Sequence, residues 1–186
     1  MIDGTARIPE LARNLSRARS GDGTNAEVVG WLRAMSGIAA ALPQPAQRNP
    51  NRQYTRTLLH RCDEFEILVL HWQPGCASSI HDHGGALCWL SVASGDMRVE
   101  NYVRRDAGAT PGYAQIAFDG RETLAAGAVD YRQDDLHLHR CITGDASAIS
   151  LHVYAHPIDR FHCFDERAQT CSETISTYDA ILTAQP

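Results

Sequence analysis

Two histidines separated by one residue, His81 and His83, are the feature of this sequence most suited to chemistry. Residues i and i+2 of a β-strand point to the same face, so both imidazoles can reach one metal ion from a rigid support. A third ligand would come from a strand adjacent in space. His139 is the first candidate, and His137 is its competitor because the two share a strand face. Imidazole suits several transition metals, so these ligands do not select one.

The residues around this pair strengthen the case for a metal site, since a His-x-His pair alone is a weak motif. Gly75, the histidine pair, Cys88 and Gly95 follow one another at the spacings of the first cupin motif. Most cupins carry a metal-binding glutamate where this chain has Cys88. Three neutral imidazoles without that carboxylate leave the metal its full charge and open positions, which a substrate and dioxygen can occupy.

The elements that must position these residues change in character near residue 50. Before it, apolar residues recur at helical spacing around residues 8–15 and again from Thr24 to Pro43. After it, short apolar and β-branched runs alternate with turn residues, and residues 94–96 mark a hairpin. The expected strands are 65–72, 87–92, 97–103, 113–118, 123–131, 137–142 and 148–154. Many short strands with regular turns indicate a sandwich or barrel.

Composition excludes several classes of protein. The chain has 186 residues, of which 44% are hydrophobic and 21% charged, which is typical of a globular domain. A net charge of −5 argues against a protein that binds nucleic acid through phosphates. There is no apolar run of membrane-spanning length. Six cysteines without a CxxC pair, in a chain without an export signal, predict free thiols and a cytoplasmic location.

Several short segments, taken together, resemble the cysteine dioxygenase family in order and spacing over residues 50–167. They are Tyr54-Thr55-Arg56, Pro74 to His83, Cys88, Leu138-His139-Arg140, Ser150 to Tyr154 and His162 to Asp165. The resemblance implies a mainly β fold, a cupin-type β-barrel of the jelly-roll kind with N-terminal α-helices. We expect one domain over residues 1–186, with a helical part at about 1–45 and the barrel at about 50–180. It also implies an Fe(II) ion held by His81, His83 and His139.

The same resemblance implies how a substrate is bound. Arg56 matches the arginine that pairs with the substrate carboxylate, a task that suits the guanidinium fork. Tyr54, two residues earlier, is expected to add a hydroxyl contact to the same group. The alternative role for Arg56 is a surface ion pair. Its position in the Tyr-Thr-Arg segment favours the role of binding the substrate carboxylate.

Further implied roles fall on one strand and its neighbour. Cys88 and Tyr154 match the pair that forms a thioether crosslink beside the iron in part of the family. Ser150, His152 and Tyr154 alternate along one strand face, so they can form a hydrogen-bonded line behind the metal. Trp72 matches an aromatic residue next to that line. Each of these residues also has a purely structural interpretation. Cys88 would then be a small buried apolar residue, and His152 would be a buried ring with satisfied hydrogen bonds.

The activity implied is thiol dioxygenation, in which both atoms of O2 are added to the sulfur of L-cysteine to give cysteine sulfinic acid, a step of cysteine catabolism. The expected partners are a small thiol and O2, and the expected state is a monomer. One departure concerns His156, which stands in place of the first of two consecutive prolines of the family. A cis bond before a non-proline residue costs about 2.5–4 kcal/mol, so a trans bond is expected there.

Two alternatives stay open. A sister thiol dioxygenase would act on 3-mercaptopropionate, but such enzymes tend to lack the cysteine at position 88 and often carry glutamine at position 56. Cys88 and Arg56 therefore favour cysteine. A cupin that binds metal without catalysis, as a sensor, would not consume O2.

Overall fold

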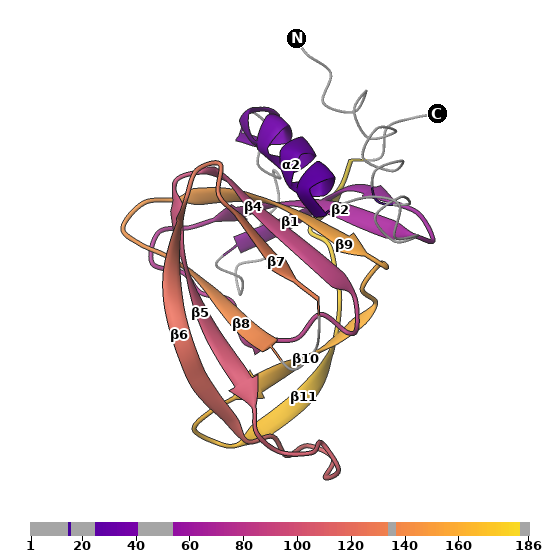
Figure 1. Ribbon diagram of the computed structural model, residues 1–186, viewed down its shortest axis with the longest axis vertical. Helices are drawn as coiled ribbons and strands as arrows, with labels where there is room; N and C mark the ends of the chain where they lie inside the picture. The colour runs from indigo at the N-terminus through magenta and orange to yellow at the C-terminus, as the bar shows by residue number, and fades with distance from the viewer. Residues whose placement is uncertain (1–14, 16–24, 41–53, 134–136, 183–186) are drawn as a thin grey trace.

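The computed structural model describes residues 15, 25–40, 54–133 and 137–182, and it shows two β-sheets with one helix, α2 (Asn25–Ala40). Figure 1 shows the two sheets facing each other, with α2 lying across one end. This arrangement is the double-stranded β-helix of the cupin fold, and it confirms the expected mainly β barrel. The expected first helix lies outside the described residues apart from Leu15, which packs in the same buried cluster as α2. No described helix has both the length and the apolar character needed to cross a membrane.

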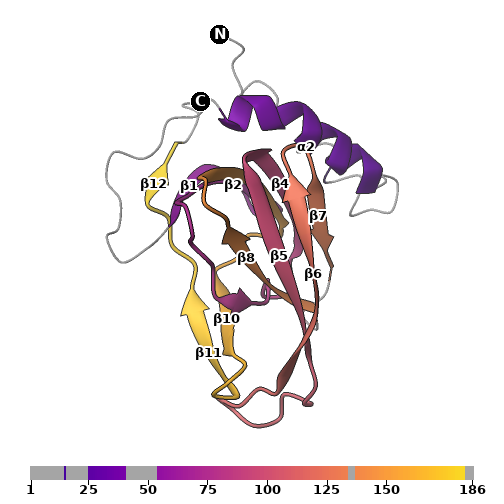
Figure 2. The same cartoon turned by 90° about the vertical axis from the view of Figure 1, so that its left-hand side faces the viewer.

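Each sheet has six strands. The first has the order β12 (Ala180–Ile181), β1 (Tyr54–Arg61), β2 (Phe65–Trp72), β9 (Ala148–Ala155), β4 (Leu87–Ser94) and β7 (Val129–Arg132). The second has the order β11 (Thr170–Ile175), β10 (Arg160–Asp165), β3 (Ile80–His81), β8 (His137–Thr143), β5 (Asp96–Arg104) and β6 (Ile116–Ala125). In Figure 2, β12 lies beside β1, so the last strand of the chain borders the first.

The first sheet is covered on both faces in its middle, which explains why every residue of β2 is buried and most of them are apolar. Its even-numbered residues, such as Leu68 and Leu70, face the barrel interior. Its odd-numbered residues, such as Ile67 and Val69, pack beneath α2. The helix contributes Val28, Leu32 and Met35, three members of the predicted apolar stripe.

The same alternation places the chemically important residues of β9 and β4 inside the barrel. Leu151 and Val153 belong to the cluster beneath α2, so the residues between them must point to the opposite face. Ser150, His152 and Tyr154 therefore face the interior, and all three are buried. Cys88 on β4 is also interior, and it is the direct register partner of Tyr154.

The predicted strands match β2, β4 and β9 of the first sheet and β5 and β8 of the second, whereas β1, β3, β10 and β12 were not predicted and the predicted strand 113–118 overlaps only the start of β6. The predicted strand 65–72 coincides with β2. The prediction of a hairpin at residues 94–96 is wrong: the chain turns at Gly95, where φ is 76°, but β4 and β5 join different sheets and do not pair with each other. The prediction of one strand over 123–131 is wrong. The chain turns at Gly127, where φ is 84°, and the two halves join different sheets as β6 and β7.

Candidate functional site

Three histidines converge inside the barrel from two strands and a loop. β3 and β8 pair with His81 directly opposite His139, and His83 follows two residues after His81. One ring nitrogen from each of the three rings lies within 4.8 Å of the others. The ring centroids are 5.3 Å apart for His81 and His83, 4.7 Å for His81 and His139, and 4.8 Å for His83 and His139. The predicted triad is thus brought together, whereas His137 is exposed at the start of β8 and lies outside the cluster.

The three rings are held in the neutral form that binds metals. Burial lowers the pKa of His81 to about 3, with the neighbouring His139 adding to the effect. Burial also lowers the pKa of His83 well below its usual value and lowers that of His139, although Asp130 opposes the shift at His139. A protonated ring cannot ligate, so these depressed values favour metal binding at neutral pH.

The hydrogen-bond partners of the rings fit a metal centre. His81 donates from Nδ1 to the carbonyl of Ser79 at 2.9 Å, which leaves its Nε2 available as a ligand atom. In His139, Nδ1 lies 3.4 Å from the carboxylate of Asp130. Both ring nitrogens of His83 are buried without a hydrogen-bond partner among the described residues. A buried polar atom without a partner is costly, and a bound metal ion would satisfy it.

Two acidic residues support the triad, and neither was predicted from the sequence. Asp130 also accepts a hydrogen bond from Nε of Arg132 at 2.9 Å; both residues lie on β7, whereas His139 lies on β8 of the other sheet. Asp82 lies between the two ligands of the His-x-His pair. It accepts the backbone N–H of His162 at 2.8 Å and contacts that ring's Nδ1 at 3.0 Å. The signal that was missed is the alternation of Asp130 and Arg132 on one face of a strand.

A chain of hydrogen bonds runs along the interior face of the first sheet. Trp72 donates from Nε1 to Oγ of Ser150 at 2.8 Å. Oγ of Ser150 lies 2.8 Å from Nε2 of His152, and Nδ1 of His152 lies 3.1 Å from the Tyr154 hydroxyl. This is the line expected from the sequence, with Trp72 at its end. Its other end approaches the triad, because the ring centroids of Tyr154 and His83 are 6.0 Å apart.

Cys88 and Tyr154 remain protonated in this environment. Burial raises the pKa of the Cys88 thiol well above its usual value, and Asp130 adds to the shift. Burial raises the pKa of the Tyr154 hydroxyl in the same way, with Cys88 adding to it. The two residues sit opposite each other on β4 and β9, so the structure brings together the pair that the sequence singled out.

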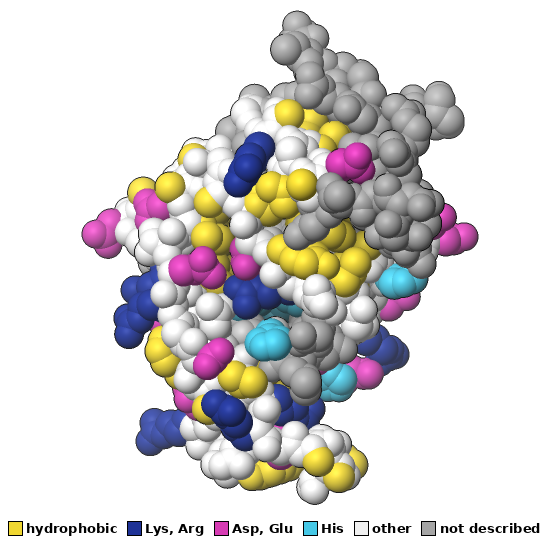
Figure 3. Space-filling model, viewed as in Figure 1, with side chains coloured by type: hydrophobic (Ala, Val, Ile, Leu, Met, Phe, Trp, Pro, Cys, Tyr) yellow, Lys and Arg dark blue, Asp and Glu magenta, His cyan; other side chains and the backbone are white. Residues whose placement is uncertain are grey.

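The pocket in front of the triad is lined by residues of both sheets. It includes Arg56 and Tyr54 from β1, Tyr154 from β9, Ile158 from the loop after β9, and Phe161 from β10. Figure 3 shows one face of the molecule, with histidine side chains near its middle and basic side chains close by. His156 is exposed and lines a separate hollow with Arg61 and Asp159. As expected from its sequence, the segment at His156 has trans peptide bonds, as do all described residues.

Comparisons with solved structures find proteins of low sequence identity that align with part of this chain. KdgF from Halomonas sp. is 12% identical with a TM-score of 0.47, over 60% of this chain and 86% of that one. The hydroquinone 1,2-dioxygenase PnpCD, solved with Cd2+ and 4-hydroxybenzonitrile, is 12% identical with a TM-score of 0.45, over 58% of this chain and 68% of that one.

Comparisons of sequence are more specific. Cysteine dioxygenase type 1 of Rattus norvegicus is 29% identical over 175 residues, which cover 92% of this chain and 85% of that protein. The Homo sapiens protein of the same name is 27% identical over an equal span. The family model for cysteine dioxygenase type I matches residues 10–167. The match includes the three converging histidines, the Cys88–Tyr154 pair and Arg56, and we conclude that the chain belongs to the cysteine dioxygenase type I family.

Proposed function

We propose that this protein is an Fe(II)-dependent thiol dioxygenase that converts L-cysteine to cysteine sulfinic acid. The observation that carries the proposal is that three neutral imidazoles, a guanidinium and a phenol line one pocket. In the reaction the thiol supplies the electrons, and both atoms of O2 end on sulfur, so no external reductant is required. The metal, when held by the triad, would supply open positions for the substrate sulfur and O2.

The pocket residues would orient the substrate through its carboxylate. Arg56 lines the pocket from β1, and its guanidinium can form two parallel hydrogen bonds to a carboxylate. Tyr54 lines the same wall and stacks on Trp72 with ring centroids 4.4 Å apart. If Arg56 and Tyr54 hold the carboxylate, the thiol end of the substrate points toward the triad. Binding the carboxylate would thus orient the reacting sulfur.

The hydrogen-bonded line would fix the proton of Tyr154. Trp72 can only donate, so Oγ of Ser150 accepts from it and has its own hydrogen to give to Nε2 of His152. A neutral His152 then carries its proton on Nδ1 and donates it to the oxygen of Tyr154. The phenolic hydrogen is left to point into the pocket, where it can donate to a developing negative charge.

A thioether between Cys88 and Tyr154 is part of the proposal. Its formation joins Sγ to a ring carbon with loss of two hydrogens, and O2 is the oxidant that the activity itself requires. Direct register and shared burial support it. Intact mass under denaturing, reducing conditions should fall by about two hydrogens, as for any covalent change of this type. An unchanged mass after turnover would reject the crosslink without affecting the dioxygenase proposal.

Oxygen uptake tests the activity directly. Protein loaded anaerobically with Fe(II) is mixed with aerated L-cysteine or 3-mercaptopropionate, and sulfinate is measured beside O2. We expect one O2 per sulfinate and a higher kcat/KM for cysteine. Higher kcat/KM with 3-mercaptopropionate would move the protein to the sister activity. Metal binding without uptake for either thiol would favour the non-catalytic sensor.

Replacing Arg56 by alanine separates substrate capture from metal binding. The R56A variant should raise KM for cysteine and leave the Fe(II) content unchanged, because Arg56 lines the pocket without belonging to the triad. Unaltered kinetics would exclude the carboxylate role of Arg56.

A further inference from the structure

We propose that a C-terminal strap, defined as Thr177, Tyr178 and Asp179, positions the Arg56 guanidinium for the substrate carboxylate. This inference rests on the proposed function of Arg56. The family model ends at residue 167, so the strap lies beyond the residues that this model matches. Its role follows from contacts made by this chain.

The strap is fixed to the backbone of Arg56 on both sides. The Arg56 N–H donates to Oδ2 of Asp179 at 2.8 Å, and the Asp179 N–H donates to the Arg56 carbonyl at 2.8 Å. Directly after it, β12 pairs in parallel with β1, with Ala180 opposite Thr57. The strap therefore extends the edge of the sheet at the residue that carries the guanidinium.

The strap also holds the side chain of Arg56. Its Nη1 donates to the Thr177 carbonyl at 3.1 Å, and its Cζ lies 5.7 Å from the centroid of the Tyr178 ring. One edge and one face of the guanidinium are thus engaged, and the group still lines the pocket. A cation on an aromatic face is attracted by the ring quadrupole, so Tyr178 restricts where the guanidinium can lie.

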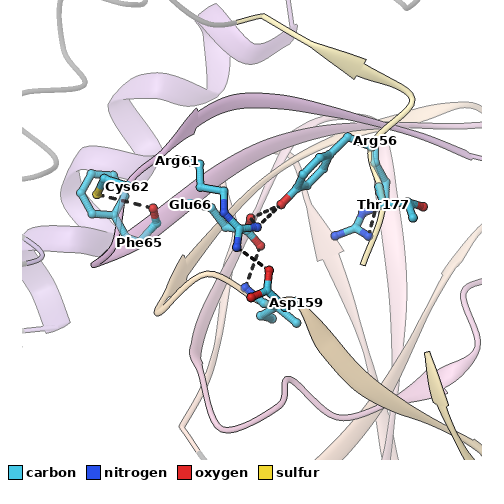
Figure 4. Close-up of polar contacts among 9 residues, drawn as sticks. Arg56, Arg61, Cys62, Phe65, Glu66, Asp159 and Thr177 are labelled. Carbon is cyan, nitrogen blue, oxygen red and sulfur yellow. Dashed lines mark hydrogen bonds and ion pairs between the residues drawn. The ribbon is translucent and has the colours of Figure 1, made fainter. Parts of the chain in front are cut away.

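Tyr178 is fixed in turn by a buried carboxylate. Its hydroxyl donates to Oε2 of Glu66 and accepts from Nη1 of Arg61, the latter at 2.6 Å. Glu66 is fully buried, and its Oε1 accepts the backbone N–H of Ile158 at 3.1 Å. Figure 4 shows Arg56 beside Thr177, and Arg61 beside Glu66 and Asp159.

These contacts connect two walls of the pocket. Ile158 lines the pocket from the loop between β9 and β10, and Arg56 lines it from β1. Between them the path runs through the Glu66 carboxylate and the Tyr178 ring. Glu66 is also the register partner of Tyr154 across β2 and β9. Tyr178 is a positioning residue, because it acts on the substrate through Arg56.

Two substitutions separate the ring from its hydroxyl. Y178L removes both, and Y178F keeps the ring that faces Arg56. We expect KM for cysteine to rise roughly tenfold in Y178L and roughly threefold in Y178F, with kcat changed less than about twofold. The control is I175A, on the same C-terminal segment, where the side chain is 60% exposed. It should behave as the wild type.

A double variant tests whether Tyr178 works through Arg56. In an R56A background there is no guanidinium to position, so adding Y178L should raise KM no further. A purely structural role would instead lower kcat, and it would persist without Arg56. An unchanged KM in Y178L, or an equal rise in both backgrounds, would overturn the inference.

A second measurement does not depend on turnover. The Arg56 Nε–H resonance of the full-length protein, assigned by its loss in R56K, should be shifted by the ring current of Tyr178. We expect it to move in Y178L and to stay nearly in place in Y178F and I175A. If the wild type consumes no O2 with any thiol, the proposed function fails, and this resonance alone decides the inference. A resonance that Y178L leaves unmoved would refute it.

Discussion

The inner wall of the pocket and its mouth are built in different ways. The wall is one strand face, β9 with its neighbours, where Ser150, His152 and Tyr154 lie two residues apart and are all buried. The mouth joins Arg56 to a partner 123 residues away in sequence, and its contacts are partly exposed. The side chains of the wall are positioned by the alternation of residues along one strand, whereas Arg56 at the mouth is positioned by contacts with a segment far away in the sequence. Damage to the wall should therefore affect metal binding and stability, and damage to the mouth should affect substrate capture.

The largest effect is expected at the triad. H139A removes one of three metal ligands and should weaken Fe(II) binding by more than about a hundredfold. This loss of affinity is larger than that expected when a hydrogen-bond partner of a ligand is removed. The matched control is H137A, from the same strand, because that side chain is exposed and outside the cluster. Metal content after dialysis and competitive titration measure the change. Equal losses in the two variants would show that the wrong histidine has been assigned.

A smaller effect on the same measurement is expected from D130N. The substitution keeps the size of the side chain but removes the charge that lies 3.4 Å from Nδ1 of His139. Loss of such a partner typically lowers metal affinity about 10- to 100-fold. E122Q is the control, because Glu122 is half exposed and approaches only Arg132 within this group, at 3.9 Å. Equal affinity in D130N and wild type would remove Asp130 from the metal centre.

The wall and the mouth should differ in their contribution to stability. S150A leaves the indole N–H of Trp72 and a nitrogen of His152 without their buried partner, which should cost about 1–3 kcal/mol. Y178F removes one hydroxyl at a half-exposed site where Arg61 and Glu66 still pair, which should cost about 1 kcal/mol. Urea unfolding of the metal-free protein, with S172A on exposed β11 as control, compares the two. The reverse ranking would contradict the distinction between wall and mouth.

The effect that is smallest at neutral pH comes from the titration of a buried histidine. Burial lowers the pKa of His152 well below its usual value of 6.5, and the nearby His139 adds to the effect. Below pH 6.5 the unfolded ring binds a proton that the native ring does not, so the free energy of unfolding falls as the pH drops. Replacing the ring in H152Q should reduce this slope by up to about 1.4 kcal/mol per pH unit in metal-free protein. Identical slopes would show that the native ring titrates normally.

The wall could be predicted from the sequence because its geometry is local. A period of two residues decides which side chains of a strand share a face, so the line from Ser150 to Tyr154 followed directly from spacing. The same argument for His81 and His83 held only in part, because β3 ends at His81 and His83 lies in the loop that follows. The mostly apolar residues of 65–72 likewise predicted a strand, which coincides with β2. The third ligand needed a choice between His139 and His137, which only the pairing of β8 with β3 resolves.

The mouth could not be predicted in the same way. No local pattern indicates that Tyr178 lies on Arg56, since that contact exists only once β12 has paired with β1. The turn at Gly127 was missed because apolar residues continue on both sides of it, and the switch between sheets is a tertiary choice. Asp130 was missed for the same reason, because its importance depends on a facing strand.

The pairing of β12 with β1 also sets an order for biosynthesis. Because chains emerge from the ribosome with the N-terminal part first, β1 is made well before β12, its edge partner. The guanidinium of Arg56 can take its final place only after residue 179 has been translated. A nascent chain could therefore assemble its histidine cluster before it gains a complete anchor for the substrate.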